Sequence, residues 1–157
     1  IRKHIKIIAS GKVTSAFHVA RAIALGADAC YQARGMMISL GCIQALMCNT
    51  NQCPTGITTQ DPKLTRGLVP EDKKVRVANY HATTLKNFAE LLGATGVTET
   101  SNLKRSHIYR RVSLNSMITY EEIFPSIKVG SMLNNDIPEK YKLDFQFADR
   151  TQWGLHP

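Results

Sequence analysis

The chain has 157 residues, of which 43% are hydrophobic and 20% are charged, and this ordinary globular composition excludes a disordered or collagen-like chain. Its 20 Lys and Arg residues outnumber its 12 Asp and Glu residues, which gives a formal net charge of +8. No apolar run approaches the roughly 18 residues needed to cross a bilayer, and residues 1–5 contain neither Met nor the apolar core of a signal peptide. We therefore expect a soluble, cytoplasmic protein that binds no membrane, and a fragment of something longer.

The positive charge is concentrated in the first part of the chain. Residues 1–97 hold 12 basic and 5 acidic side chains, whereas residues 98–157 hold 8 and 7. A basic excess is typical of proteins that bind nucleic acid, an anionic membrane or a phosphorylated ligand. The densest basic run, residues 73–76, is short and is interpreted as the solvated first turn of a helix, so no specific nucleic-acid binding is expected.

The first 47 residues predict two consecutive strand–turn–helix units. A β-branched run at residues 5–9 predicts a buried strand, and Thr14 or Ser15 can cap a helix that ends at Gly26. The second unit is expected as a strand at residues 28–33, a turn at Arg34 and Gly35, and a helix at residues 36–47. Such units with tight loops indicate an α/β fold with a parallel sheet or barrel.

The rest of the chain predicts one further regular element. Residues 48–70 are rich in turn formers, and a long irregular segment is normally functional or held by something other than a core. A helix is expected to begin near Pro70 and to stop at Gly93. Its expected apolar stripe consists of Ala78, Ala82, Leu85, Ala89 and Leu92. Residues 108–109 and 120–124 are ambiguous, and residues 126–157 show little periodicity.

Two strand-end turns, Ser10-Gly11-Lys12 and Ala33-Arg34-Gly35, are candidates for an anion site. Glycine at the end of a parallel strand allows backbone N–H groups to approach a ligand, and a following helix N-terminus favours an anion. In a (β/α)₈ barrel the loops after the last two strands commonly bind phosphate. The pattern is also compatible with glycines that serve the turn geometry alone.

Three cysteines with the spacing Cys42-x5-Cys48-x4-Cys53-Pro54 form the second candidate site. Zinc sites normally use closer pairs and four ligands, whereas iron–sulfur clusters take thiolates from looping segments, commonly with Pro after the last Cys. Three ligands suit a three-iron cluster. Cys30 is a conceivable fourth ligand, but a buried strand cysteine is the commoner interpretation, and the alternative for all three is a structural role.

These segments resemble the FMN-binding domain of glutamate synthases. The resemblance to its last two barrel units rests on residues 9–12, 22–28 and 33–37, and that to its cluster-binding segment on residues 41–45, 48–57 and 59–60. The match is close over residues 5–97, and residues 106–111 are similar to the tail of stand-alone, archaeal-type members.

The resemblance implies an FMN-dependent (β/α)₈ domain with a [3Fe-4S] cluster, in an oxidoreductase of the class acting on CH–NH₂ donors. Such enzymes form L-glutamate from 2-oxoglutarate and ammonia or glutamine, through 2-iminoglutarate. Their electrons come from ferredoxin or an NAD(P)H-oxidising subunit. Carried over by motif, the iron ligands are Cys42, Cys48 and Cys53, and the residues around the FMN phosphate are Ser10, Gly11, Lys12, Arg34 and Gly35. No catalytic residue is assigned.

A complete barrel needs about 250 residues, and two of its eight units are visible here. We therefore expect residues 1–97 to be the C-terminal part of such a barrel, with the iron–sulfur segment at 42–60. The cluster-binding loop is expected to be followed by a helical tail, and residues 98–157 to form a C-terminal extension of mixed or irregular structure. The remainder of the barrel is then a required partner, and the chain alone is expected to be inactive. Two alternatives remain: an iron–sulfur electron-transfer or scaffold module without flavin, and a phosphate-binding barrel of another family with structural cysteines.

Overall fold

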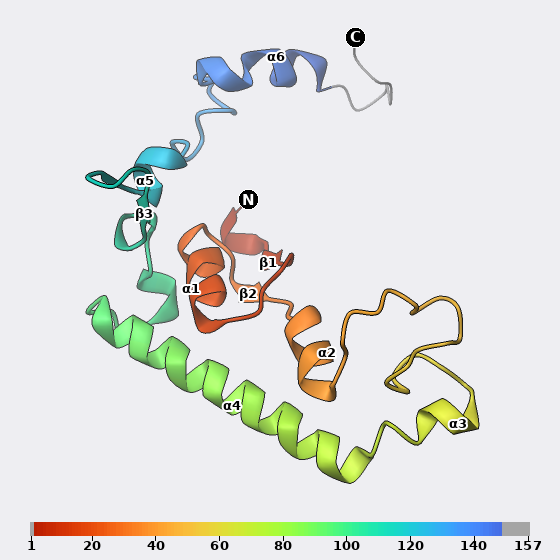
Figure 1. The fold of residues 1–157 in the computed structure, drawn as a ribbon. Coiled ribbons are helices and arrows are strands. Elements are labelled where there is room, and N and C mark those ends of the chain that lie inside the picture. The colour runs from red at the N-terminus through yellow and green to blue at the C-terminus, as the bar shows by residue number, and fades with distance from the viewer. Residues whose placement is uncertain (1, 149–157) are drawn as a thin grey trace. The chain divides into compact units, whose positions relative to one another are not determined.

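The computed structural model describes residues 2–148 and shows a mixed α/β fold (Figure 1). Its contacts divide the chain into two units, Ile1–Tyr120 and Glu121–Pro157. The elements of the first unit are the 3-10 helix η1 (Arg2–His4), β1 (Ile8–Ala9), α1 (Ala16–Ala24), β2 (Ala29–Cys30), α2 (Arg34–Leu40), α3 (Pro62–Thr65), α4 (Pro70–Ala94), the 3-10 helices η2 (Thr100–Asn102) and η3 (Arg105–His107), β3 (Tyr109–Arg111) and β4 (Met117–Thr119). α5 (Tyr120–Ile123) begins at the boundary, and α6 (Glu139–Phe147) belongs to the second unit.

β1 and β2 form the expected parallel pair, but each strand is shorter than its sequence predicts. Ile8 pairs with Ala29 and Ala9 with Cys30, and the ladder closes with a hydrogen bond from the Tyr31 amide to the Ala9 carbonyl (2.8 Å). Ile8 remains 47% exposed. Strand length is set by cross-strand pairing, and among the described residues each strand has one partner, so the apolar run at residues 5–9 stays largely outside the ladder.

α1 confirms the helix and both of its predicted ends. The Ser15 side chain caps it by accepting a hydrogen bond from the His18 amide at 3.4 Å, which satisfies one of the free donors of the first turn. The helix ends where Gly26 takes a left-handed φ of +112°, a conformation that costs a residue without Cβ little. Its buried positions, Ala16, Ala20 and Ala24, recur every four residues.

α2 differs from the helix that the sequence predicts. It starts at Arg34, two residues earlier than expected, and ends at Leu40, seven residues earlier. Gly41 terminates it with a φ of +108°, and Gln44 and Leu46 follow with φ of 57° and 58°, which no α-helix accommodates. The sequence predicts a helix through residues 42–47 because they are mostly apolar, but the backbone there is not helical.

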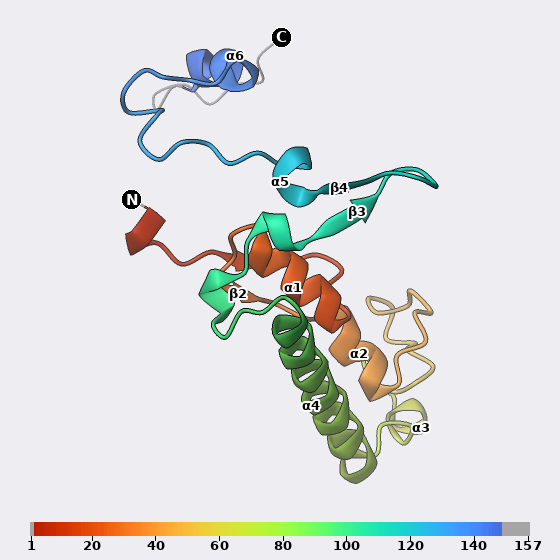
Figure 2. The ribbon, with the colours of Figure 1, turned by 90° about the vertical axis from the view of Figure 1, so that its left-hand side faces the viewer.

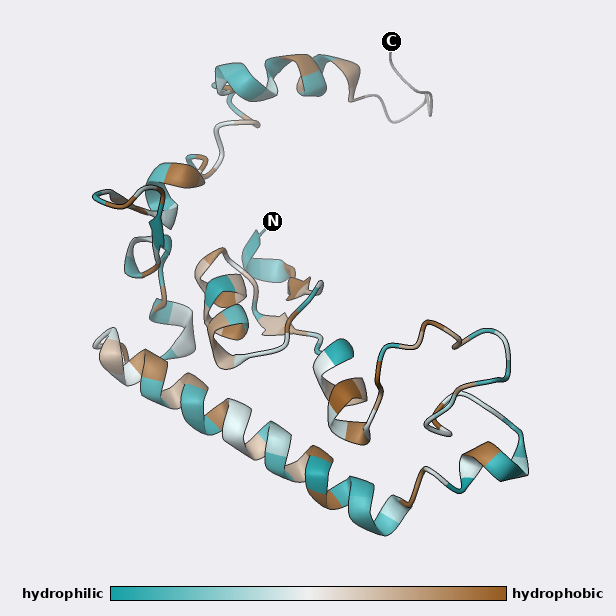
Figure 3. Ribbon diagram, viewed as in Figure 1, coloured by the Kyte–Doolittle hydropathy of each residue, from teal (hydrophilic) through white to brown (hydrophobic). Residues whose placement is uncertain are grey.

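α4 begins at Pro70 as expected and runs past α1 and α2 (Figures 1 and 2). Its buried residues are Thr84 and Phe88, whereas Leu85, from the expected stripe, is 53% exposed. Hydrophobic and hydrophilic residues are interspersed along the helix (Figure 3). The apolar stripe of the sequence is therefore not the face that is buried here: α4 packs against α1 and α2, and the buried face carries the larger Phe88.

A hairpin that the sequence did not predict completes the first unit; only Tyr109 of its strands lies in a stretch that was ambiguous in sequence. Tyr109 pairs with Thr119 and Arg111 with Met117 in an antiparallel β3–β4 ladder. The Arg105 guanidinium donates to the carbonyl of Leu25, at the end of α1 (3.3 Å). The connection before the hairpin is thereby attached to the first βα unit.

The second unit contains α6, which the weak periodicity of residues 126–157 did not predict. The Glu121 carboxylate accepts hydrogen bonds from both the amide and the hydroxyl of Ser126. Residues 149–157 lie outside the described residues. None of the described helices is long and apolar enough to span a membrane.

Candidate functional site

The two strand-end loops lie at the same edge of the β1–β2 pair, because parallel strands end on the same side. The loop after β1 carries residues 10–15, and the loop after β2 carries residues 31–33 and leads into α2. A cavity of about 420 Å³ opens between them. Its lining consists of Ser10, Gly11, Lys12, Val13, Tyr31, Ala33, Arg34, Met37, Cys42, Gln44, Leu46 and Cys48. Four of the five residues predicted to surround a phosphate thus meet two of the three predicted cluster ligands in one cavity.

The charged residues of this lining, Lys12 and Arg34, are both basic. Lys12 comes from the loop after β1 and Arg34 from the first turn of α2, so two separate elements each contribute a basic residue to the lining. A guanidinium offers planar, paired donors and an ammonium a compact charge, and both suit a phosphate. The cavity has the charge and donor set of an anion site.

The backbone after β1 is left-handed at two consecutive residues. Gly11 has a φ of +107° and Lys12 a φ of 54°. The left-handed region costs a residue with a side chain roughly 1–2 kcal/mol, and such conformations are concentrated at ligand sites. Lys12 therefore holds a costly conformation at the edge of the cavity that its ammonium group would serve.

Gly35 stands apart from the other four predicted residues. It is buried in the first turn of α2 and borders a second hollow, with Thr14 and Tyr80, rather than the cavity. A Cβ at this position would collide with the Tyr80 hydroxyl and lie 2.9 Å from its Cζ atom. Gly35 thus serves the packing of α4 on α2 in this structure, and its contact with a phosphate stays a prediction.

Cys42 and Cys48 lie on opposite ends of a short irregular segment after α2. Cys42 follows the left-handed Gly41 and its amide donates to the Met37 carbonyl at 3.0 Å, so it belongs to the cap of α2 and not to the helix interior that the sequence suggested. Its sulfur accepts a hydrogen bond from the Gln44 amide at 3.4 Å. Cys48 is exposed. Both cysteines line the cavity.

Cys53 is buried and does not line the cavity. A hydrogen bond with the Thr55 hydroxyl (3.4 Å), together with one from the Thr58 amide, lowers the pKa of the Cys53 thiol to about 6. A thiolate is the form that binds a metal. Among the described residues 2–148, no group of three or more His, Cys, Asp or Glu side chains lies close enough to hold a metal ion. The donors suit iron chemically, but the described conformation does not gather all three.

Cys30 lies on β2, half-buried, and burial raises the pKa of its thiol. Burial disfavours the thiolate. This agrees with the interpretation of Cys30 as a packed strand residue rather than a fourth ligand.

The loop between Cys48 and Cys53 is fastened by Asn51, a residue that sequence analysis did not single out. Asn51 has a φ of 61°; its side-chain oxygen accepts from the Gln60 amide (2.6 Å) and its carbonyl accepts from the Thr59 hydroxyl (2.6 Å). Asparagine tolerates the left-handed region better than most residues, and this is the signal that could have identified it. These two hydrogen bonds join Asn51 to residues 59 and 60. They hold together part of the irregular segment 48–70, which was expected to be held by something other than a hydrophobic core.

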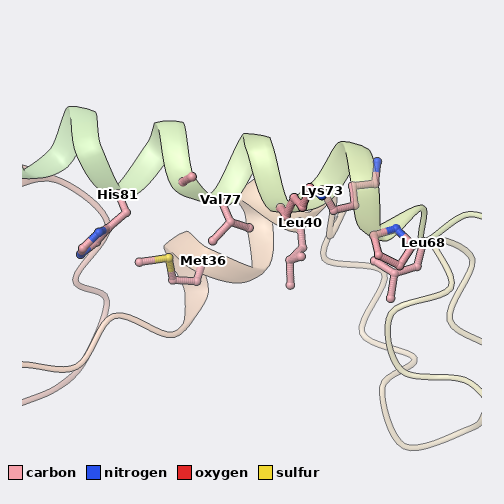
Figure 4. Close-up of a pocket in the computed structure, with 9 residues that line it drawn as sticks. Met36, Leu40, Leu68, Lys73, Val77 and His81 are labelled. Carbon is pink, nitrogen blue, oxygen red and sulfur yellow. The ribbon is translucent and has the colours of Figure 1, made fainter.

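A larger groove of about 670 Å³ lies between α2 and α4 (Figure 4). Met36 and Leu40 project into it from α2, and Val77 and His81 from α4. It contains none of the predicted site residues, and its lining is mainly apolar. The groove is therefore separate from the candidate anion and thiol site.

The comparisons with known proteins point to one family. Residues 1–98 match the family described as the conserved region in glutamate synthase. The chain is 41% identical over 123 residues to the glutamate synthase large subunit-like protein YerD of Bacillus subtilis. The aligned residues cover 78% of this chain and 23% of that protein. It is 42% identical over 104 residues to the archaeal glutamate synthase [NADPH] of Methanocaldococcus jannaschii, covering 66% of this chain and 20% of that protein.

The archaeal-type glutamate synthase [NADPH] of Thermotoga maritima is 38% identical over 116 residues, 73% of this chain and 23% of that protein. The chain thus spans about a fifth to a quarter of the length of these relatives. No solved structure matches it.

Proposed function

This chain belongs to the glutamate synthase family, and from that premise we propose that it is the part of a flavin and iron–sulfur oxidoreductase that holds the FMN phosphate and a [3Fe-4S] cluster. The whole enzyme would form L-glutamate from 2-oxoglutarate and ammonia or glutamine, with electrons from ferredoxin or an NAD(P)H-oxidising subunit. The observation that carries the proposal is the cavity where Lys12 and Arg34 meet Cys42 and Cys48.

The phosphate part of the proposal rests on charge and backbone geometry. A flavin phosphate is a dianion near neutral pH, and Lys12 and Arg34 would neutralise it from two sides. The Ser10 hydroxyl would donate to a phosphate oxygen, and Gly11 would allow the backbone to approach it closely. Gly35 would contribute through the first turn of α2.

The cluster part rests on the three thiols of residues 42–53. Cys42 and Cys48 would bind iron from the cavity side, and Cys53 has the lowered pKa that favours the thiolate. When bound, the flavin would supply hydride transfer to the imino substrate, and the cluster would supply single-electron transfer. Since Cys53 lies outside the cavity, ligation by all three requires the segment around it to close on the other two.

The (β/α)₈ architecture is part of the same proposal. β1 and β2 would be two adjacent strands of a barrel completed by the remainder of the enzyme. The partly exposed Ile7 (43%) and Ile8 (47%) support it, because a barrel buries such strand residues. Isolated, the chain lacks the other strands that contribute to a barrel active site, so we expect it to form no glutamate.

The test compares FMN with riboflavin, which has the same ring system without the phosphate. We expect the chain to quench FMN fluorescence with a dissociation constant at least tenfold lower than for riboflavin. Lys12→Gln and Arg34→Gln should each weaken FMN binding by about tenfold, as expected for a lost bond to a charged group, and leave riboflavin binding unchanged. Lys3→Gln makes the same charge change on η1, away from the cavity, and should leave the preference intact.

Two results would overturn parts of the proposal. Equal affinity for FMN and riboflavin would reject the phosphate site. If the chain retains iron and acid-labile sulfide after anaerobic reconstitution but does not prefer FMN to riboflavin, the result would instead support the electron-transfer or scaffold module.

A further inference from the structure

We propose that Tyr80 of α4 is a positioning residue that holds the two loops of the anion site against each other, and that its hydroxyl thereby increases the affinity for a phosphate monoester. The inference rests on the proposed function, because it concerns the same cavity. It adds a residue that follows the cysteine segment in the chain and that neither loop contains.

The Tyr80 hydroxyl bonds to both loops at once. It donates to the Thr14 carbonyl at 2.9 Å and accepts from the Gln32 side-chain amide at 2.6 Å. Thr14 comes two residues after Lys12, and Gln32 two residues before Arg34. One phenol oxygen therefore lies between the chain segments that deliver the two cations.

A third contact fixes the ring from the side of α2. Gly35 is buried, and a Cβ there would lie 2.9 Å from the Tyr80 Cζ atom and 3.3 Å from the Gln32 Nε2 atom. The absence of a side chain at Gly35 thus leaves room for the phenol. Because Gly35 directly follows Arg34, the ring also packs against the backbone that carries the second cation.

The β1–β2 ladder alone is a weak support for these loops. It contains two residue pairs, and its last bond, from the Tyr31 amide to the Ala9 carbonyl, lies before both cationic residues. Tyr80 makes its contacts beyond that point.

The backbone of Tyr80 is part of a long helix, α4, which has 25 residues. The Thr84 hydroxyl donates a further hydrogen bond to the Tyr80 carbonyl (2.8 Å). Thr84 and Phe88, on the following turns, are the buried residues of α4. A long helix anchored by its buried face is a rigid platform for a group that must position others.

The proposal predicts an effect on phosphate recognition that differs from a general loss of stability. Tyr80→Phe keeps the ring against Gly35 and removes both hydrogen bonds. The dissociation constants for FMN and riboflavin are measured by fluorescence quenching, with the melting temperature as a control for folding. We expect FMN binding to weaken about three- to tenfold, as for a lost neutral hydrogen bond, and riboflavin binding to change by less than twofold. Tyr109→Phe removes a hydroxyl from an exposed residue of β3 and should change neither constant.

Gln32→Met provides a second variant that leaves Tyr80 intact and removes only the donor of the second loop. It should lower the FMN preference in the same direction. The double variant should bind FMN no more weakly than Tyr80→Phe, because the two residues share one bond. Gln32→Met alone keeps the test decisive even if Tyr80→Phe folds poorly.

The outcomes separate the two proposals. A wild-type chain without preference for FMN over riboflavin rejects the phosphate site and with it this inference. A wild-type preference that Tyr80→Phe and Gln32→Met retain overturns the inference and leaves the site standing. Equal weakening of FMN and riboflavin assigns Tyr80 to packing alone and also overturns it.

Discussion

The carboxylate of Asp28 accepts a hydrogen bond from the backbone amide of Ile7 at 2.8 Å and so joins the start of β2 to the residue before β1. The same carboxylate bonds to the Arg2 guanidinium at 2.9 Å, and Lys6 lies 3.5 Å away. Arg2 in turn donates to the Gly26 carbonyl at 2.7 Å. The Asp28 side chain thus holds the N-terminal segment to the turn between α1 and β2. This contact lies at the end of the strands opposite the cavity.

Asp28→Asn should lower the stability of the chain in a pH-dependent way. The hydrogen bond from the Ile7 amide, and then the Arg2 side chain, hold the pKa of the Asp28 carboxyl below its usual value. A lowered folded-state pKa means that the unfolded chain binds the proton more tightly, so the carboxylate stabilises the fold above the unfolded pKa of about 3.9. That stabilisation is lost as the pH falls through the folded-state pKa.

The measurement is the melting temperature of the wild type and the variant between pH 3 and 7. The difference should be full near pH 6–7 and shrink below about pH 4. Asp144→Asn, the same substitution on α6, is the charge control. A difference that is constant across this pH range would show that Asp28 acts without its charge.

Gly56→Ala should destabilise the cysteine segment by about 2 kcal/mol or more. Gly56 has a φ of +77°, and a Cβ would collide with the carbonyl oxygen of Leu64, a backbone atom that cannot rotate away. Gly93→Ala is the matched substitution, because Gly93 is helical in α4 and has open space around it. It should stabilise by about 0.5–1 kcal/mol. Denaturant unfolding of both variants checks the opposite signs, and a shared sign would contradict the prediction.

Asn51→Gly should release the clip between Asn51 and Gln60 without straining the backbone. Glycine accepts the φ of 61° but cannot accept the Gln60 amide, which the Asn51 side chain binds at 2.6 Å. We expect exchange of the Gln60 amide hydrogen to accelerate about tenfold. Asn49→Gly, in the same exposed loop, should leave that amide unchanged; an equal acceleration there would mean that loop flexibility, rather than the clip, sets the rate.

Cys48→Ser should abolish iron binding, whereas Cys30→Ser should leave it intact. Cys48 lines the candidate site and is exposed, while Cys30 is half-buried on β2 with a raised thiol pKa. After anaerobic reconstitution, the wild type should hold about three iron atoms per chain, with a broad visible shoulder and an EPR signal. Loss of iron in Cys30→Ser but not in Cys48→Ser would reassign the ligands.

The local signals of the sequence predicted the ends of several elements well. Ser15 caps α1, Gly26 ends it, and Pro70 opens α4 as expected. The parallel orientation of the two short strands was also predicted. These features depend on the conformational preferences of single residues and their near neighbours, which the sequence displays directly.

Signals that depend on packing were less reliable. The apolar residues 42–47 suggested a continuation of α2 beyond Gly41, where the helix ends. The apolar stripe of α4 includes the exposed Leu85, whereas Phe88, outside that stripe, is buried. Local composition cannot show which face meets a neighbour, because that choice is made by contacts with distant segments.

By itself, the sequence determined the helix caps, the pairing of two βα units, the spacing of the three cysteines and the resemblance that the relatives confirm. Only the tertiary structure decided that Lys12, Arg34, Cys42 and Cys48 share one cavity. It also placed Tyr80 against Thr14, 66 residues earlier in the chain. The physical reason is that caps and turns are fixed by interactions within a few residues. A site, in contrast, is assembled by packing between segments that are far apart in the sequence, and their sequence separation does not set their distance in space.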